Sequence, residues 1–162
     1  MNGGILALDI ATTTGWAEGL PGERPISGSM RLAPPGSPHA AVYGAMLAFL
    51  GARLSAFRYR LVVFEAPLDP RWKGAMTNTN TARLLLGLPA VVEAVAYQTG
   101  HMPREATSGD VRKHTLGCRP KAAEAKPMVI AKARAMGFDP RDDNEADALM
   151  LWHYARDVLA KK

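Results

Sequence analysis

The sequence predicts an α/β protein in which a mixed five-stranded sheet, in the order β-β-β-α-β-α-β-α, is flanked by helices. Three short strand-like segments separated by turn residues open the chain, and a helical segment and a strongly apolar strand follow them. The second half alternates helical patterns with one more short strand. A length of 162 residues is typical of one domain with its own hydrophobic core, so we expect a single domain over residues 1–162.

The first three strands are expected over residues 5–11, 15–20 and 26–32. Turn residues separate them at 12–15 and 21–22. Connections this short join antiparallel strands, so these segments should form the antiparallel part of the sheet.

A helix is expected over residues 39–57, where apolar side chains recur at helical spacing. The apolar run at residues 61–65 predicts a central strand parallel to the first. Residues 80–99 predict a second helix, with Pro89 either kinking it or starting its second half. Residues 101–107 predict the fifth strand.

The last third of the chain is expected to be helical. Ser108 should start a helix that stops at Gly117, and Pro127 should open the next one, which ends at Gly137. The final helix is expected over residues 144–162. Its buried face should consist of Ala148, Leu151, Trp152, Ala155 and Leu159.

The net charge is +5, and its distribution along the chain is more informative than the total. Residues 104–134 contain eight Lys or Arg and three acidic residues, and five acidic residues follow within residues 139–147. An enzyme that cuts a nucleic-acid backbone needs this juxtaposition, because cations hold the phosphates and carboxylates hold catalytic metals.

The compartment expected for this chain is the cytoplasm. Cys118 is the only cysteine, so no intrachain disulfide is expected. The N-terminus has no basic start, and Asp9 interrupts its apolar run, so no signal peptide is expected. The apolar stretch at residues 84–97 contains Pro89 and Glu93 and does not predict a membrane span.

Two acidic residues belong to apolar strands, where a charge is costly unless it is paired or coordinates a metal. Asp9 lies within residues 5–11, and Glu65 ends the run at residues 61–65. Because these strands are expected to be neighbours, both carboxylates should lie at the carboxyl edge of the sheet. We therefore predict a Mg²⁺ site at this edge. The alternative is a pair of buried structural acids, each paired with a Lys or Arg.

The start of the final helix offers further ligands. Asp147 lies three residues after Asn144 and four after Asp143, so all three can face one way. The apolar neighbours of Asp147 predict close packing of this helix on the sheet. The alternatives are that Asp143 is a solvated residue that caps the helix and that Asp147 is a surface acid.

These features, in this order, resemble the RuvC-type Holliday junction resolvases. The segments that carry the resemblance are Asp9 with residues 12–17 (Thr-Thr-Thr-Gly-Trp-Ala), Glu65, residues 106–117, residues 121–129, and residues 145–149 (Glu-Ala-Asp-Ala-Leu). The resemblance covers nearly the whole chain and implies the ribonuclease H-like fold. The compact chain is more similar to the phage- or prophage-encoded branch than to a housekeeping bacterial copy.

The resemblance implies a Mg²⁺-dependent endonuclease of DNA recombination and repair, in which Mn²⁺ can substitute. Two ions would be bridged by Asp9 and completed by Glu65 and Asp147, and the cuts would leave 5′-phosphate and 3′-hydroxyl ends. Lys126 would be a further catalytic residue that stabilises charge on the scissile phosphate. The family's fourth ligand corresponds to Asn144, whose amide oxygen brings no charge, and Asp143 is the alternative.

The resemblance also implies a four-way DNA junction as the partner and a twofold homodimer that cuts its two symmetry-related strands. Leucines over residues 80–97 suit a dimer interface or, equally, a core helix. The residues expected to bind DNA lie in the loop after Glu65 and in the basic region: Arg71, Trp72, Lys73, Arg112, Lys113, His114, Arg119 and Lys121. Trp72 suits base stacking, or it packs over its own loop.

Three other functions stay open from the sequence. A related ribonuclease H-like nuclease could act on flaps or RNA–DNA hybrids. A non-catalytic junction-binding protein would retain the acids as structure, and Asn144 favours that alternative. An actin-like ATPase fragment would explain residues 8–15 as a phosphate loop, but the second domain of such enzymes does not fit within this length.

Overall fold

The computed structural model of the chain describes residues 3–67 and 79–160, without the side chain of Ala122. Its five strands form one sheet in the order β3-β2-β1-β4-β5. The strands are β1 (Gly4–Asp9), β2 (Thr13–Gly19), β3 (Ile26–Arg31), β4 (Tyr59–Glu65) and β5 (Arg104–Ala106). The first three are antiparallel neighbours, whereas β1–β4 and β4–β5 are parallel pairs. The mixed α/β sheet expected from the sequence is therefore confirmed.

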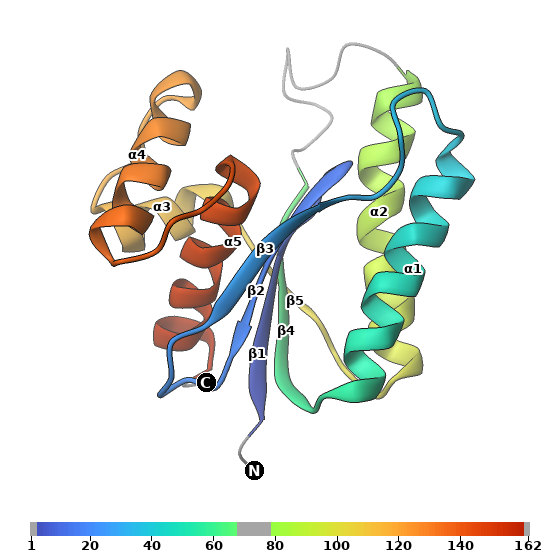
Figure 1. Cartoon of the computed structure of the whole chain (residues 1–162), viewed down its shortest axis with the longest axis horizontal. Helices are drawn as coiled ribbons and strands as arrows, with labels where there is room; N and C mark the ends of the chain where they lie inside the picture. Colours follow the sequence, from blue (N-terminus) through green and yellow to red (C-terminus); the bar gives the residue numbers. More distant parts are fainter. Residues whose placement is uncertain (1–2, 68–78, 161–162) are drawn as a thin grey trace.

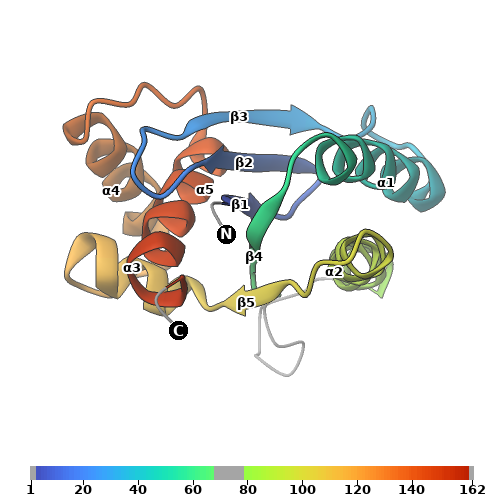
Figure 2. The same cartoon turned by 90° about the horizontal axis from the view of Figure 1, so that it is seen from below.

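Helices cover both faces of this sheet (Figures 1 and 2). On one face lie α1 (His39–Ala56) and α2 (Thr79–Gln98). On the other lie α3 (Ser108–Leu116), α4 (Ala122–Ala135) and α5 (Asp143–Tyr154), and a π-helical turn, η1 (Ala155–Leu159), continues α5. None of the helices in the described ranges has the length and apolar character needed to cross a bilayer.

The alternation of side chains along the strands divides the core into two layers. On β1, Ile5 and Ala7 pack toward α5, while Leu6 and Leu8 pack toward α1 and α2. The α5 side is closed by Trp152, which is fully buried and donates from its indole nitrogen to the Ile5 carbonyl at 3.2 Å. This bond ties α5 to the central strand of the sheet.

Several expected elements differ from those in the structure. β2 begins at Thr13, within the expected turn, and the expected final helix is α5, which ends at Tyr154 and continues as η1. Pro127 does not open α4: the helix begins at Ala122, and the proline lies inside it, where it removes one backbone hydrogen bond without ending the helix. Pro89 likewise lies inside one continuous helix, α2. The fifth strand spans Arg104–Ala106, because β5 pairs with β4 over three residues.

Candidate active site

The sheet brings Asp9 and Glu65 to the same edge and the same face. Leu8 of β1 pairs with Phe64 of β4 in parallel register, so the next residue on each strand, Asp9 and Glu65, lies at the carboxyl edge. The residues two positions earlier, Ala7 and Val63, belong to the core layer against α5. Since alternate residues share a face, both carboxylates point toward the α5 side.

The first turn of α5 supplies the other acidic residues. Asp142 is the N-cap, and its carboxylate accepts from the Glu145 backbone N–H at 2.9 Å. Because Asp142 is the cap, Asp143 is the first residue of the helix, and Asp147 lies four positions further along it. Ala146, Ala148 and Leu149 are fully buried, so the helix packs closely on the sheet around the half-buried Asp147.

Burial raises the pKa of Asp9 well above its usual range, and the charges of Glu65, Asp147 and Asp143 raise it further. Lys126 opposes these effects. Acidic charges of β4 and α5 therefore act on the carboxyl of β1, which places the four acids in a common electrostatic environment.

Glu65 and Asp147 are perturbed in the same direction. Burial, followed by the charge of Asp147, raises the pKa of Glu65 to about 7. Burial also raises the pKa of Asp147 to about 6, with a further contribution from Asp143. The positive charge of Arg112 lowers the pKa of both groups, and a hydrogen bond from Ser108 lowers that of Glu65. The site thus concentrates negative charge that its own cations compensate only in part.

Lys126 of α4 reaches over this cluster. Its ammonium lies 2.5 Å from the Asp143 carboxylate, which raises the pKa of the lysine and lowers that of the aspartate. The charges of Asp147 and Asp9 also raise the pKa of Lys126. The lysine expected to lie beside the acids is therefore placed there, and Asp143 is its ion-pair partner.

The donors at this edge fit a hard divalent cation. They are oxygens, which Mg²⁺ prefers, and their mutual repulsion is the condition that a cation relieves. Within residues 3–67 and 79–160, no three His, Cys, Asp or Glu side chains already converge as a closed ligand set. The charges of these acids affect one another, but the carboxylates do not converge on one point. Their mutual repulsion and the ion pair of Asp143 with Lys126 account for this open arrangement.

The residues expected to bind DNA have different surroundings in the structure. Arg112 of α3 lies toward the acids, and its Nε is buried with no hydrogen-bond partner in the described structure. Lys113 and Lys121 are exposed. Arg119 pairs with Asp110 at 2.8 Å, and the His114 ring lies 3.1 Å from Asp157. Arg71, Trp72 and Lys73 lie outside the described residues.

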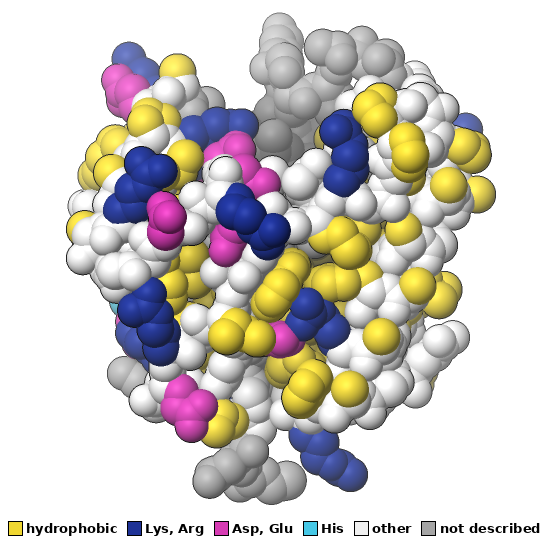
Figure 3. All heavy atoms as spheres, viewed as in Figure 1, with side chains coloured by type: hydrophobic (Ala, Val, Ile, Leu, Met, Phe, Trp, Pro, Cys, Tyr) yellow, Lys and Arg dark blue, Asp and Glu magenta, His cyan; other side chains and the backbone are white. Residues whose placement is uncertain are grey.

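The surface carries both charges on this side of the molecule. On the face shown in Figure 3, most of the visible Asp and Glu side chains lie on the α4–α5 side, interleaved with Lys and Arg. Acidic and basic side chains are therefore mixed on this side of the surface.

Sequence reasoning missed three contributors to this region. Arg112 was expected at phosphates, but its charge acts directly on Glu65 and Asp147. Ser108 was expected only as a helix start, and it also bonds Glu65. The contact of Glu145 with β3 was not expected: its side chain is buried and accepts from the Ser27 hydroxyl at 2.8 Å. The spacing of Asp142 and Glu145 predicts only local bonds at the helix start, so it did not signal this contact.

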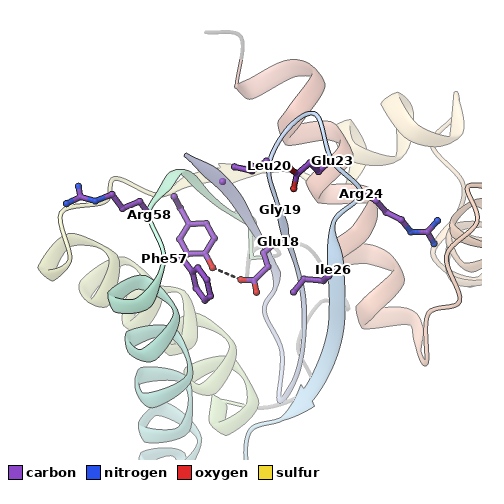
Figure 4. A pocket seen from close by; sticks show the side chains of 10 residues that line it. Glu18, Gly19, Leu20, Glu23, Arg24, Ile26, Phe57 and Arg58 are labelled. Atoms are coloured by element: carbon purple, nitrogen blue, oxygen red, sulfur yellow. Dashed lines mark hydrogen bonds between the residues drawn. The ribbon is translucent and has the colours of Figure 1, made fainter. Parts of the chain in front are cut away.

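A cavity of about 330 Å³ lies at the other end of β1 and β2. Figure 4 shows the hydrogen bond between Tyr59 and Glu18 in its wall, and Ile26 and Phe57 form an apolar rim. Glu18 in this wall is already paired with Arg53 and Tyr59, in contrast to the acids at the carboxyl edge.

A five-stranded mixed sheet with this strand order, and with helices on both faces, defines a ribonuclease H-like α/β fold. It is the fold of RuvC. A structure of Thermus thermophilus RuvC covers 98% of this chain and 96% of its own at a TM-score of 0.72 and 18% identity. T. thermophilus RuvC in complex with a Holliday junction substrate covers 96% of each chain at a TM-score of 0.74 and 21% identity.

The similarity to solved structures is not accompanied by a match in sequence searches. No protein-family model matches the chain, and no curated protein matches it. At these identities the comparison establishes the fold, so the expected RuvC-like architecture is confirmed, while activity has to be argued from the site.

Proposed function

We propose that this protein is a Mg²⁺-dependent endonuclease that resolves four-way DNA junctions by paired nicks, leaving 5′-phosphate and 3′-hydroxyl ends. The observation that carries the proposal is the gathering of Asp9, Glu65 and Asp147 at the carboxyl edge of a RuvC-like sheet without equivalent positive charge. The structure of RuvC on a Holliday junction supports branched DNA as the partner.

The three carboxylates would hold the metal, with Asp9 between the contributions of β4 and α5. When bound, two Mg²⁺ ions would supply an activated water and stabilise the leaving oxygen. Mn²⁺ would substitute, because it accepts the same oxygen donors. Asp143 is paired with Lys126 and Asn144 lies beside it in the first turn, so either could add the fourth donor.

The cations around the acids would hold the scissile phosphate. Lys126 lies beside Asp143, and Arg112 lies near Glu65 and Asp147 with its Nε unpartnered in the described structure. A phosphate seated over the acids would therefore meet a positive charge from α3 and another from α4. Both would stabilise the charge that builds on the phosphate in the transition state.

A homodimer would suit the symmetry of the substrate. Leu86 of α2 is 41% exposed while Leu88 is fully buried, so this helix serves the core and leaves apolar surface outside it. We propose that a second copy covers that surface and presents its own acids to the symmetry-related strand.

A binding protein without catalysis is the main competing function. In such a protein, buried acids would be paired for stability, as Glu18 is with Arg53 and Tyr59. Asp9, Glu65 and Asp147 instead raise one another's pKa values or are raised by burial, which is a costly arrangement for structure alone.

Incubation of the protein with a labelled four-way junction, a flap, a duplex and an RNA–DNA hybrid, with and without Mg²⁺, tests the proposal. We expect cleavage of the junction only, and only with Mg²⁺. Cleavage of the flap or hybrid in preference to the junction would indicate a different nuclease. Tight junction binding without cleavage under any divalent metal would indicate a binding protein.

A further inference from the structure

The start of α5 is attached to the edge strand β3 by four residues, Ser27, Ser29, Asp142 and Glu145, here called the β3 clamp. The Ser29 hydroxyl donates to Asp142 Oδ2 at 2.5 Å, and the Ser27 hydroxyl donates to Glu145 Oε1 at 2.8 Å. Each bond joins residues more than a hundred positions apart in the chain. The clamp therefore fixes α5 against a strand that the candidate active site does not use.

The two carboxylates of the clamp also accept from backbone N–H groups at the helix start, in an arrangement that resembles a capping box but uses the N–H before the N-cap. Asp142 Oδ1 accepts from the Glu145 backbone N–H at 2.9 Å, and Glu145 Oε2 accepts from the Arg141 backbone N–H at 3.0 Å. A capping box needs only one oxygen of each carboxylate. The second oxygen of each carboxylate is committed to a β3 serine. The serine bonds thus do something that capping alone does not require.

The strand register shows what the clamp holds in place. Asp9 pairs with Gly15 on β2, and Gly15 pairs with Ser29 on β3, so the three residues form one row across the sheet. A Cβ on Gly15 would lie 1.9 Å from the Asn144 carbonyl oxygen. The backbone of α5 therefore lies directly on Gly15, with Asp9 on one side of it and Ser29 on the other.

Helix geometry connects the two sides of α5. Asp142 and Glu145 are separated by three positions and share the side toward β3. Asp143 and Asp147 are separated by four positions and share a neighbouring side, where their charges reach Asp9. Since each residue turns the helix by about 100°, fixing the first side fixes the direction of the second.

We propose that the β3 clamp is a positioning device that sets the rotation and height of the first turn of α5, so that Asp143 and Asp147 face Asp9 and Glu65. This inference rests on the proposed metal-dependent function. Ser27, Ser29 and Glu145 touch neither metal nor DNA in this role. They act through the geometry of the acids, as the outer partners of metal ligands do.

The test is to remove the serine bonds while leaving every carboxylate in place. In the Ser27→Ala/Ser29→Ala variant, the backbone bonds of Asp142 and Glu145 remain and only their two bonds to the β3 serines are lost. Calorimetric titration with Mn²⁺ alone, without DNA, should show affinity weakened by about tenfold or more. Ser27→Thr/Ser29→Thr restores both hydroxyls and should recover most of it. Ser55→Ala, an exposed serine at the end of α1, is the matched control.

The outcomes separate this inference from the proposed function. If the wild-type chain binds no Mn²⁺, the proposed metal site fails. If the wild type binds Mn²⁺ and the double variant binds it equally well while folded, the clamp is only a structural link and the inference is wrong. If circular dichroism shows the double variant to be unfolded, Ser29→Ala replaces it; that single variant should weaken binding about threefold, and unchanged affinity would overturn the inference.

Discussion

Glu18 and Asp9 are acids on neighbouring strands of one sheet, close to opposite ends of it, and their surroundings differ completely. Glu18 is 8% exposed, and its two oxygens accept from the Arg53 guanidinium and the Tyr59 hydroxyl, each at 2.5 Å. Arg53 in turn stacks over Trp16 at 3.9 Å. Asp9 instead shares its environment with Glu65, Asp147 and Asp143, and only Lys126 among its electrostatic neighbours favours ionisation.

The comparison distinguishes an acid that serves the fold from acids that serve a ligand. A buried carboxylate that stabilises the fold is neutralised by partners that the chain itself provides. The acids at the carboxyl edge lack that neutralisation, which costs stability that a bound cation would restore. If this distinction is right, removing charge at the two ends must have opposite consequences for activity and stability.

The largest expected effect is on catalysis. Asp9→Asn, Glu65→Gln and Asp147→Asn should each reduce Mg²⁺-dependent junction cleavage on the order of a thousandfold, because each removes a charged metal donor. Junction binding should survive, since phosphate contacts come from other residues. Glu18→Gln is the matched control and should cleave at a normal rate. Normal turnover by one of the three variants would remove that residue from the site.

The corresponding effect at the other end is on stability. Arg53→Met should lower the free energy of unfolding by about 3 kcal/mol, because it leaves Glu18 buried without its charged partner. Denaturant unfolding measures this change. Cleavage per folded molecule should be unchanged. A loss below about 0.5 kcal/mol would mean that Glu18 is not held by this pair.

His153 of α5 provides a third kind of buried titratable group, one whose ring nitrogens have no hydrogen-bond partner in the described structure. Burial, with the charge of Arg156, lowers its pKa to about 4. The unfolded chain takes up this proton at higher pH than the folded one. Stability should therefore fall as the pH drops from about 6.5 to about 4, by at most roughly 3 kcal/mol.

The His153 effect is measured by unfolding at several pH values. His153→Leu should flatten the pH dependence across this window, because an apolar side chain in that site does not titrate. An equally steep pH dependence in His153→Leu would assign the effect to other groups.

The smallest expected effect concerns the fourth metal donor. Asp143 is held by Lys126 at 2.5 Å, so Asp143→Asn frees the lysine as well as removing a charge. If Asn144 is the donor, Asn144→Asp should tighten Mg²⁺ binding and Asn144→Ala should weaken it by up to about tenfold. If Asp143 is the donor, Asp143→Asn should weaken Mg²⁺ binding more than Asn144→Ala does. If Asp143→Asn and Asn144→Ala both show the wild-type dependence of cleavage on Mg²⁺ concentration, three carboxylates suffice.

Local patterns were sufficient to single out the acids of the candidate site. Asp9 and Glu65 stood out because charges in apolar strands need a reason, and Asp147 because its spacing and apolar neighbours placed it on a packed helix. The antiparallel start of the sheet and the parallel pairing of β1 with β4 followed from short turns and the apolar run that became β4. These inferences depend on neighbours in sequence, where periodicity and turn chemistry are informative.

The missed features depend on contacts between distant segments. Ser27 and Ser29 meet the start of α5 only because β3 is the third strand in a particular register. The position of Arg112 near Glu65 depends on how α3 packs against α5. The misplaced start of α4 had another cause: Pro127 is tolerated within the helix, so a residue preference was overridden by tertiary packing.

The most direct measurement is the analysis of products from a four-way junction with each strand labelled in turn, incubated with the wild-type protein and Mg²⁺. The account predicts nicks at symmetric positions in two opposing strands and linear duplexes that DNA ligase seals without prior treatment, as 5′-phosphate and 3′-hydroxyl ends require. An intact junction, or cleavage that Asp9→Asn leaves unchanged, would contradict it.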